Sequence, residues 1–199
     1  IIASELRHHA PFTTFGTVTG IIIMAVFMHF QISKEISTTL FWLTHPLHVF
    51  LSALVTTAMY RLHDEGRALW TVVIGYVGSV GIATLSDSLI PYVGEWLLNM
   101  PHRGMHLGFI EKWWLVNPLA LAGIFVGYFL PRTNIPHAGH VLLSTWASLF
   151  HMIMALGTQV DVATWILAAL FLFLAVWVPC CTSDIVFPLL WVKDKGDVP

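Results

Sequence analysis

The sequence predicts an all-α, polytopic membrane protein whose six transmembrane helices form two inverted-topology three-helix repeats. Composition predicts the membrane class, because 57% of the 199 residues are hydrophobic and only 10% are charged. Soluble domains are about 45–50% apolar and about 25% charged. The repeat is predicted by three motifs that occur in the same order in both halves of the chain.

Six apolar stretches are each long enough to cross a hydrocarbon layer about 30 Å thick, at about 1.5 Å per helical residue. We expect them at residues 12–31, 39–60, 68–91, 113–130, 138–157 and 162–190. The last stretch is longer than one span needs, and we expect Pro179 and Pro188 to break or kink it. These limits predict a first repeat at 1–91, a connecting outer loop at 92–112, and a second repeat with a short cytoplasmic tail at 113–199.

Orientation follows from the cationic residues of alternate loops. One side of the membrane collects Arg7, Arg61, Arg67, Arg132, Lys193 and Lys195, and the other collects Lys34, Arg103 and Lys112. Cytoplasmic loops carry an excess of Lys and Arg, so we expect both termini in the cytoplasm.

Each expected span of the first half has a counterpart in the second half. The first and fourth open with P-x4-G-x3-G, starting at Pro11 and Pro118. The second and fifth open with HxxHVxLS, and the third and sixth carry SDxxxP. The glycine pairs predict close helix packing. Because each repeat has an odd number of spans, the second enters the membrane from the opposite face, an arrangement typical of secondary transporters.

The histidine and aspartate motifs predict metal coordination. Residues at i and i+3 share a helix face, so two imidazoles can reach one ion while a neighbouring helix supplies a carboxylate. This donor set is common for Zn²⁺, Fe²⁺, Mn²⁺ or Ni²⁺. We expect two pseudo-symmetric clusters, one near each membrane face. The candidate ligands are His45, His48, Asp87, His137, His140, Asp184, His9, Glu5, Glu111 and Cys181.

Further polar residues fit around these ligands. Ser86, Ser183 and Asn117 are candidates for orienting them through hydrogen bonds, and Cys180 is a second soft donor beside Cys181. His151 lies in the middle of its span, where it either lines a pathway or is a satisfied core histidine. Simpler roles remain open for other residues: interfacial hydrogen bonds for the HxxH histidines, helix capping for the aspartates, and a solvated carboxylate for Glu5.

These residues favour an integral membrane transporter or channel for a divalent transition-metal cation. The alternative is an intramembrane zinc-dependent hydrolase acting on a lipid-like substrate, so enzymatic activity stays open. Duplication of the ligand set favours transport, because a hydrolase needs one active site. A haem-binding subunit fits less well, since paired axial histidines should lie at one depth, whereas His45 and His137 are expected at opposite faces.

The net charge and the number of cysteines limit which kinds of partner the chain can bind. A net charge of −2 with no basic stripe excludes nucleic acid. Two adjacent cysteines offer no disulfide framework. The expected partners are the lipid bilayer and the metal ion, and the small size leaves room for a homodimer.

Overall fold

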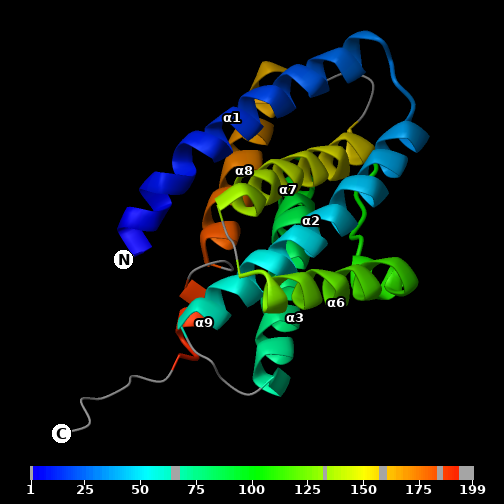
Figure 1. Cartoon of the computed structure of the whole chain (residues 1–199). Helices are drawn as coiled ribbons and strands as arrows, with labels where there is room; N and C mark the ends of the chain where they lie inside the picture. Colours follow the sequence, from blue (N-terminus) through cyan, green and yellow to red (C-terminus); the bar gives the residue numbers. More distant parts are fainter. Residues whose placement is uncertain (1, 64–67, 132–133, 157–160, 183–185, 193–199) are drawn as a thin grey trace, which may run out of the picture.

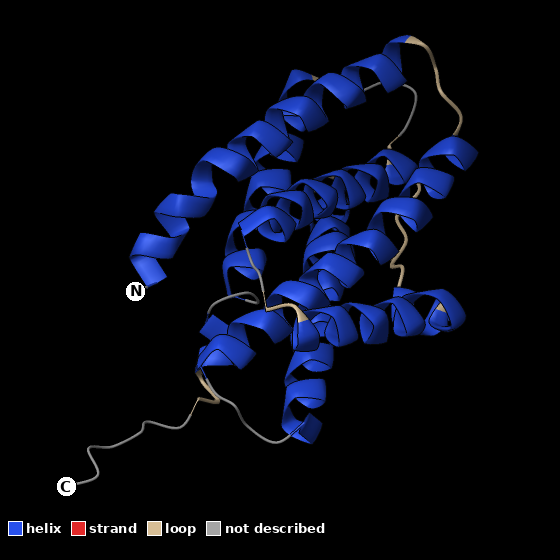
Figure 2. Cartoon of the chain, viewed as in Figure 1, coloured by secondary structure: helices blue, strands red, loops and turns tan. Residues whose placement is uncertain are grey.

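A computed structural model describes the chain except for residues 1, 64–67, 132–133, 157–160, 183–185 and 193–199. Every regular element in these described ranges is helical (Figure 2). The larger helices are α1 (Ile2–His29), α2 (Lys34–His63), α3 (Ala68–Thr84), α6 (Trp113–Phe129), α7 (Asn134–Ala155) and α8 (Val162–Cys181). The shorter ones are the π-helix η1 (Leu85–Leu89), α4 (Ile90–Leu97), α5 (Gly108–Glu111) and α9 (Phe187–Leu189).

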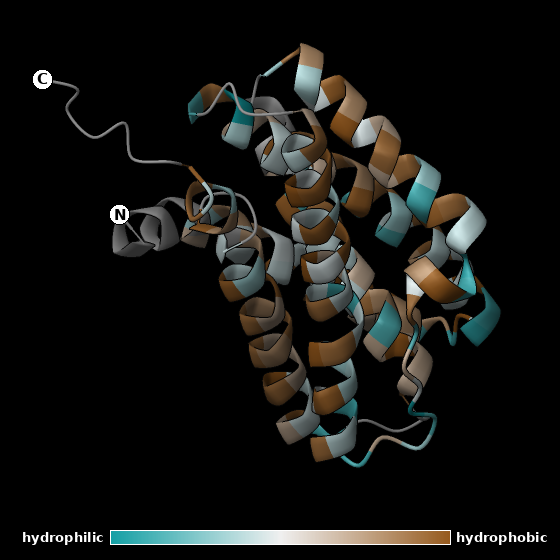
Figure 3. Cartoon of the chain, turned by 90° about the horizontal axis from the view of Figure 1, so that it is seen from below, coloured by the Kyte–Doolittle hydropathy of each residue, from teal (hydrophilic) through white to brown (hydrophobic). Residues whose placement is uncertain are grey.

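Long apolar helices dominate the chain and indicate a membrane protein. Within the described ranges, five segments are long and apolar enough to span a membrane: Ala10–His29, Lys34–His63, Ala68–Leu97, Ala138–Ala155 and Val162–Cys180. Trp113–Phe129 is apolar but only 17 residues long, which corresponds to about 25 Å at 1.5 Å per residue. Hydrophilic residues gather near helix ends and connections (Figure 3). The all-helical prediction is therefore confirmed, with five clear spans where six were expected.

The outer surface is apolar, as lipid contact requires. Large hydrophobic side chains of α1, α6 and α8 are exposed, among them Phe15, Ile22, Phe125, Phe129 and Ile166, at 58–66% of their full accessibility. So much exposed apolar surface would be unfavourable in water but is compatible with a hydrocarbon environment.

Helices α2 and α7 pack against each other at the centre of the fold (Figure 1). Helix α2 also contacts α6 and α3, and α7 also contacts α1 and α8. The buried face of α2 is unusually polar, with His45, His48, Ser52 and Thr56 all at 0–1% exposure. Small and polar side chains let helices approach closely and hydrogen-bond across the interface. The two central helices therefore bring polar groups into the interior of an otherwise apolar bundle.

The glycine pairs lie at close helix contacts, as the sequence predicts. A Cβ atom at Gly123 would collide with the carbonyl oxygen of Phe50 and lie 2.9 Å from the Cβ of Ala53, both on α2. The equivalent atom at Gly16 would lie 2.7 Å from the Oγ1 of Thr145 on α7. Glycine is required at such positions because the neighbouring backbone or side chain occupies the space of a methyl group.

Replacing Gly123 with alanine should lower the free energy of unfolding by about 1–3 kcal/mol, through overpacking against α2. The matched control is Gly81→Ala, because no atom lies within 4 Å of a Cβ at Gly81. Alanine there should be neutral or mildly stabilising, since it favours the helix by about 1 kcal/mol. Thermal unfolding of both variants in detergent checks the prediction, and equal melting temperatures would contradict it.

The third predicted span does not end at residue 91. The helix continues through η1 and α4 to Leu97, and only then begins the connection to α5. The π-helical turn explains this continuity: the Ile90 N–H donates to the carbonyl of Leu85, five residues earlier. Pro91 has no N–H to donate, and the carbonyl of Ser86, five residues before it, instead lies 2.8 Å from the Ser148 hydroxyl of α7. A hydroxyl from a neighbouring helix thus compensates for the proline, and the expected loop at 92–112 is shorter.

Candidate functional site

The described side chains include only part of the predicted ligand set. Ser183 and Asp184 lie outside the described residues. Glu5 and His9 in α1, His137 in α7 and Cys181 in α8 have helical backbones, but their side chains are not among those described. The site is therefore built from His45, His48, Asp87, His140 and the residues around them.

Asp87 joins the two histidines of the first HxxH motif, as the sequence predicts. Its Oδ2 lies 2.9 Å from the Nδ1 of His45 and 2.7 Å from the Nδ1 of His48. The other oxygen, Oδ1, accepts hydrogen bonds from the hydroxyls of Ser86 at 2.7 Å and Ser144 at 2.9 Å. Asp87 is fully buried. A buried carboxylate with four donors is well satisfied, and each imidazole is held by its Nδ1.

This arrangement selects the tautomer of both histidines. A neutral imidazole that donates from Nδ1 carries its lone pair on Nε2. The Nε2 atoms of His45 and His48 are buried and have no hydrogen-bond partner among the described residues. Asp87 therefore leaves each of these nitrogens available as an acceptor or a metal ligand.

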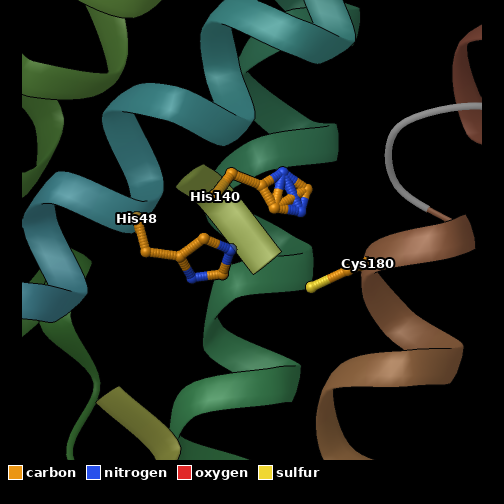
Figure 4. A group of neighbouring side chains, drawn as sticks. All are labelled: His48, His140 and Cys180. Atoms are coloured by element: carbon orange, nitrogen blue, oxygen red, sulfur yellow. The ribbon is translucent and has the colours of Figure 1, made fainter. Parts of the chain in front are cut away.

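His48, His140 and Cys180 form the only group of three or more metal-ligating side chains found among the described residues. One ligand atom from each lies within 4.8 Å of the others, and all three residues are buried. In Figure 4 the His48 ring points toward His140 and Cys180, which approach from two other helices. Ligands bound to one tetrahedral zinc at 2.0–2.3 Å lie about 3.3–3.8 Å apart. Side-chain shifts of about 1 Å would bring these donors to coordination distance.

The surroundings of the cluster match those of a protein metal site. Ligating histidines usually donate their second ring N–H to a carboxylate, which orients the ring and raises its basicity. Asp87 has this relation to His48. The Sγ of Cys180 lies 3.5 Å from the Ser144 hydroxyl, which in turn bonds Asp87. The described residues can thus supply two imidazoles and one thiolate, a set suited to a borderline-soft divalent cation.

The structure differs from the two-cluster prediction, because His140 lies with His48 in one group. Their ring centroids are 5.2 Å apart. Helix α2 runs from Lys34 to His63, so His48 lies near its middle and not at its end, where a cluster at one membrane face would need it. Since α2 and α7 pack along each other, His48 and His140 meet at their interface. Among the described side chains, residues from both halves therefore gather in one interior cluster.

Cys180 contributes the thiol that belongs to the cluster. It is 1% exposed and packs with Val176, one turn earlier, and Val141 on α7. The sequence predicts Cys180 as a second soft donor beside Cys181, whose side chain is not among those described. The signal that identifies Cys180 is its i, i+4 relation to the buried Val176.

Three other predicted residues lie in different hydrogen-bonded groups. Glu111 accepts from the Leu107 N–H at 2.8 Å and contacts the Nδ1 of His106 at 3.2 Å. The amide oxygen of Asn117 accepts from the Tyr76 hydroxyl at 3.1 Å. His151 is buried and lies 2.6 Å, Nδ1 to Oε1, from Glu95. In the structure, none of these contacts joins Glu111, Asn117 or His151 to the His48 cluster.

Sequence reasoning missed Glu95, Ser144 and Ser88. Glu95 was expected in the polar loop after residue 91, whereas α4 buries it completely. Ser144 was visible as the last residue of the second HxxHVxLS motif, but its bond to Asp87 links different halves of the chain. Ser88 follows Asp87 directly, and its hydroxyl lies 3.5 Å from the Nε2 of His151. The repeated motif was thus a usable signal only for Ser144.

No protein-family model, no curated protein and no solved structure matches this chain.

Proposed function

We propose that this chain is a membrane carrier for a divalent transition-metal cation, with Zn²⁺ as the cation that best suits its donors. The observation that carries the proposal is the cluster of His48, His140 and Cys180 on three helices, with His48 oriented by Asp87. Thiolate and imidazole together favour zinc over the harder cations Mg²⁺ and Ca²⁺. Iron, manganese and nickel were equally compatible with a histidine and aspartate set, and the thiol shifts the preference toward zinc.

Burial favours a carrier over the alternative, a zinc-dependent hydrolase. His48 and His140 are fully buried and Cys180 is 1% exposed. A hydrolase needs an open coordination position that a substrate can reach. A cavity of about 300 Å³ among the described residues lies elsewhere, near the turn between α1 and α2, and is lined in part by Met28, Lys34 and Met154. A closed site between central helices fits the occluded state of a carrier.

We further propose that the carrier consists of two inverted three-helix repeats, and the packing of the helices supports this. If α1, α2 and α3 correspond to α6, α7 and α8, each of the following contacts between two of these six helices has a counterpart. The α2–α6 contact corresponds to α7–α1, α3–α6 to α8–α1, and α2–α3 to α7–α8, while α2–α7 corresponds to itself. Thr182, directly before the second SDxxxP motif, and Val186, within it, are also π-helical. Under the proposal, both termini are cytoplasmic and the repeats rock about the α2–α7 interface.

Zinc uptake into proteoliposomes tests the function directly. Purified protein should bind Zn²⁺ and carry it to an indicator inside the vesicles faster than protein-free vesicles do. The matched pair is Cys180→Ser, which should remove both binding and flux, and Ser33→Ala, in the exposed turn between α1 and α2, which should keep both. Bound zinc without flux would favour the hydrolase, and no bound metal would eliminate both functions.

A further inference from the structure

A second group of ionisable side chains lies inside the bundle, apart from the metal cluster. Glu95 and His151 are both fully shielded from solvent, and the Nδ1 of His151 lies 2.6 Å from the Oε1 of Glu95. The Oε2 of Glu95 also accepts from the Gly104 N–H at 3.2 Å. Ionisable residues within apolar spans are costly, so they are functional candidates by default. The metal site does not use this pair.

The pair is connected to the surface by two further groups in single file. The His106 ring stands edge-on to the His151 ring, with centroids 5.3 Å apart. Behind it, the Nδ1 of His106 lies 3.2 Å from the Oε2 of Glu111. The side chains of His106 and Glu111 are 31% and 41% exposed, compared with 0% for His151 and Glu95. One carboxylate, two imidazoles and a second carboxylate thus lead in this order from the surface to the interior, and chains of such side chains are typical of proton relays.

The other elements around the pair contribute apolar or neutral groups. From α2, the Phe41 ring stands edge-on to His151 at 5.4 Å. From α8, the Phe171 ring packs against Gly94, beside Glu95. From η1, the Ser88 hydroxyl faces the Nε2 of His151 and accepts the His106 N–H at 3.0 Å. Among the described contacts, the titratable side chain that faces the pair is therefore His106, followed by Glu111.

The π-helix η1 joins this group to the metal site. Asp87 orients His48 on one side, and Ser88, the next residue, contacts His151 on the other. π-Helical turns inside α-helices are found mostly at functional sites. The five-residue segment η1 thus contacts both the His48 side of the metal cluster and the Glu95–His151 pair. A conformational change at one of these groups can therefore alter the other.

We infer that the Glu95–His151 pair is a proton-binding site, reached through Glu111 and His106, and that H⁺ is the ion whose movement is coupled to metal transport. This inference rests on the proposed function. One proton enters through the exposed Glu111–His106 pair, passes to the His151 ring and is held between His151 and Glu95. It is released when the carrier changes state, without any covalent step.

Glu95→Gln in full-length protein tests the inference, with Glu35→Gln as the matched control because Glu35 is exposed at the start of α2. In proteoliposomes with zinc and pH indicators, the wild type should move protons together with zinc. Glu95→Gln should abolish this proton signal while the protein still binds zinc, since Glu95 is not one of the cluster's ligands. Glu35→Gln should match the wild type.

Infrared difference spectra at two pH values provide a readout that needs no transport. In the wild type and in Glu35→Gln, the carboxyl and imidazole bands should change between the two pH values. This change should be missing in Glu95→Gln and in His151→Asn. Zinc flux without proton movement, or a band change that survives in Glu95→Gln, would overturn the inference and leave the carrier intact. Zinc binding without flux would instead refute the carrier, while the infrared bands would still decide whether the pair binds a proton.

Discussion

Replacing His140 with alanine should lower the zinc affinity of the purified protein by more than about 100-fold, because losing a direct ligand costs more than the 10–100-fold typical of an outer hydrogen-bond partner. His140 is fully buried, and its ring is 5.2 Å from that of His48. Zinc competition with a chelating dye measures the affinity. His63→Ala is the matched control, because His63 is exposed at the end of α2 and bonds the carbonyl of Met59.

A buried histidine also contributes to packing, so a second variant separates ligation from folding. Cys180→Ser keeps the side chain small and polar, and should preserve the fold. Co²⁺ substituted for zinc should show thiolate-to-metal charge-transfer absorption in the wild type and in His63→Ala. This absorption should vanish in Cys180→Ser. If it persists there, the ligand set described above is wrong.

Asp87→Asn should reduce zinc affinity by about 10–100-fold although Asp87 is not placed as a ligand, because losing the carboxylate removes the group that orients His48. An amide has one oxygen and two N–H donors, so it cannot satisfy all four donors that now surround Asp87. Zinc titration of the folded variant measures the effect. Asp161→Asn is the control, because Asp161 is an exposed N-cap of α8 that bonds the Thr164 N–H at 2.8 Å, and asparagine also caps well.

Asp87→Ala should in addition destabilise the fold by about 3–5 kcal/mol, the range observed when one partner of a buried ion pair is removed. It leaves His45, His48, Ser86 and Ser144 buried without their common acceptor. Thermal unfolding without metal separates this effect from the loss of zinc binding. Wild-type stability in Asp87→Ala would mean that the hydrogen bonds around Asp87 contribute little.

Much of the fold could be predicted from apolar length alone. Helices α1, α2, α7 and α8 overlap the expected spans, because long apolar stretches must satisfy their backbone hydrogen bonds internally. The end of the third span could not be predicted. Pro91 normally marks a helix boundary, and only the π-helical turn and the Ser148 hydroxyl allow the helix to continue. The inverted repeat and the cytoplasmic placement of the termini remain predictions.

The candidate site, like the fold, could be predicted from the sequence only in part. The His45–Asp87 and His48–Asp87 contacts were predictable from the spacing of the HxxH motif and an aspartate in the adjacent span. The contact between Ser144 and Asp87 and the burial of Glu95 were not. A motif indicates which residues share one helix face, but it does not indicate which other helix covers that face.

The sequence by itself determined the helical class, the apolar spans and the pairing of His45 and His48 with Asp87, because these depend on composition and on periodicity along one helix or between adjacent ones. Only the tertiary structure decided that His48 and His140 share one site, that Cys180 completes it, and that Glu95 lies buried against His151. The physical reason is that helix packing sets the depth and rotation of each helix relative to its neighbours, and a shift of a few residues changes which side chains meet.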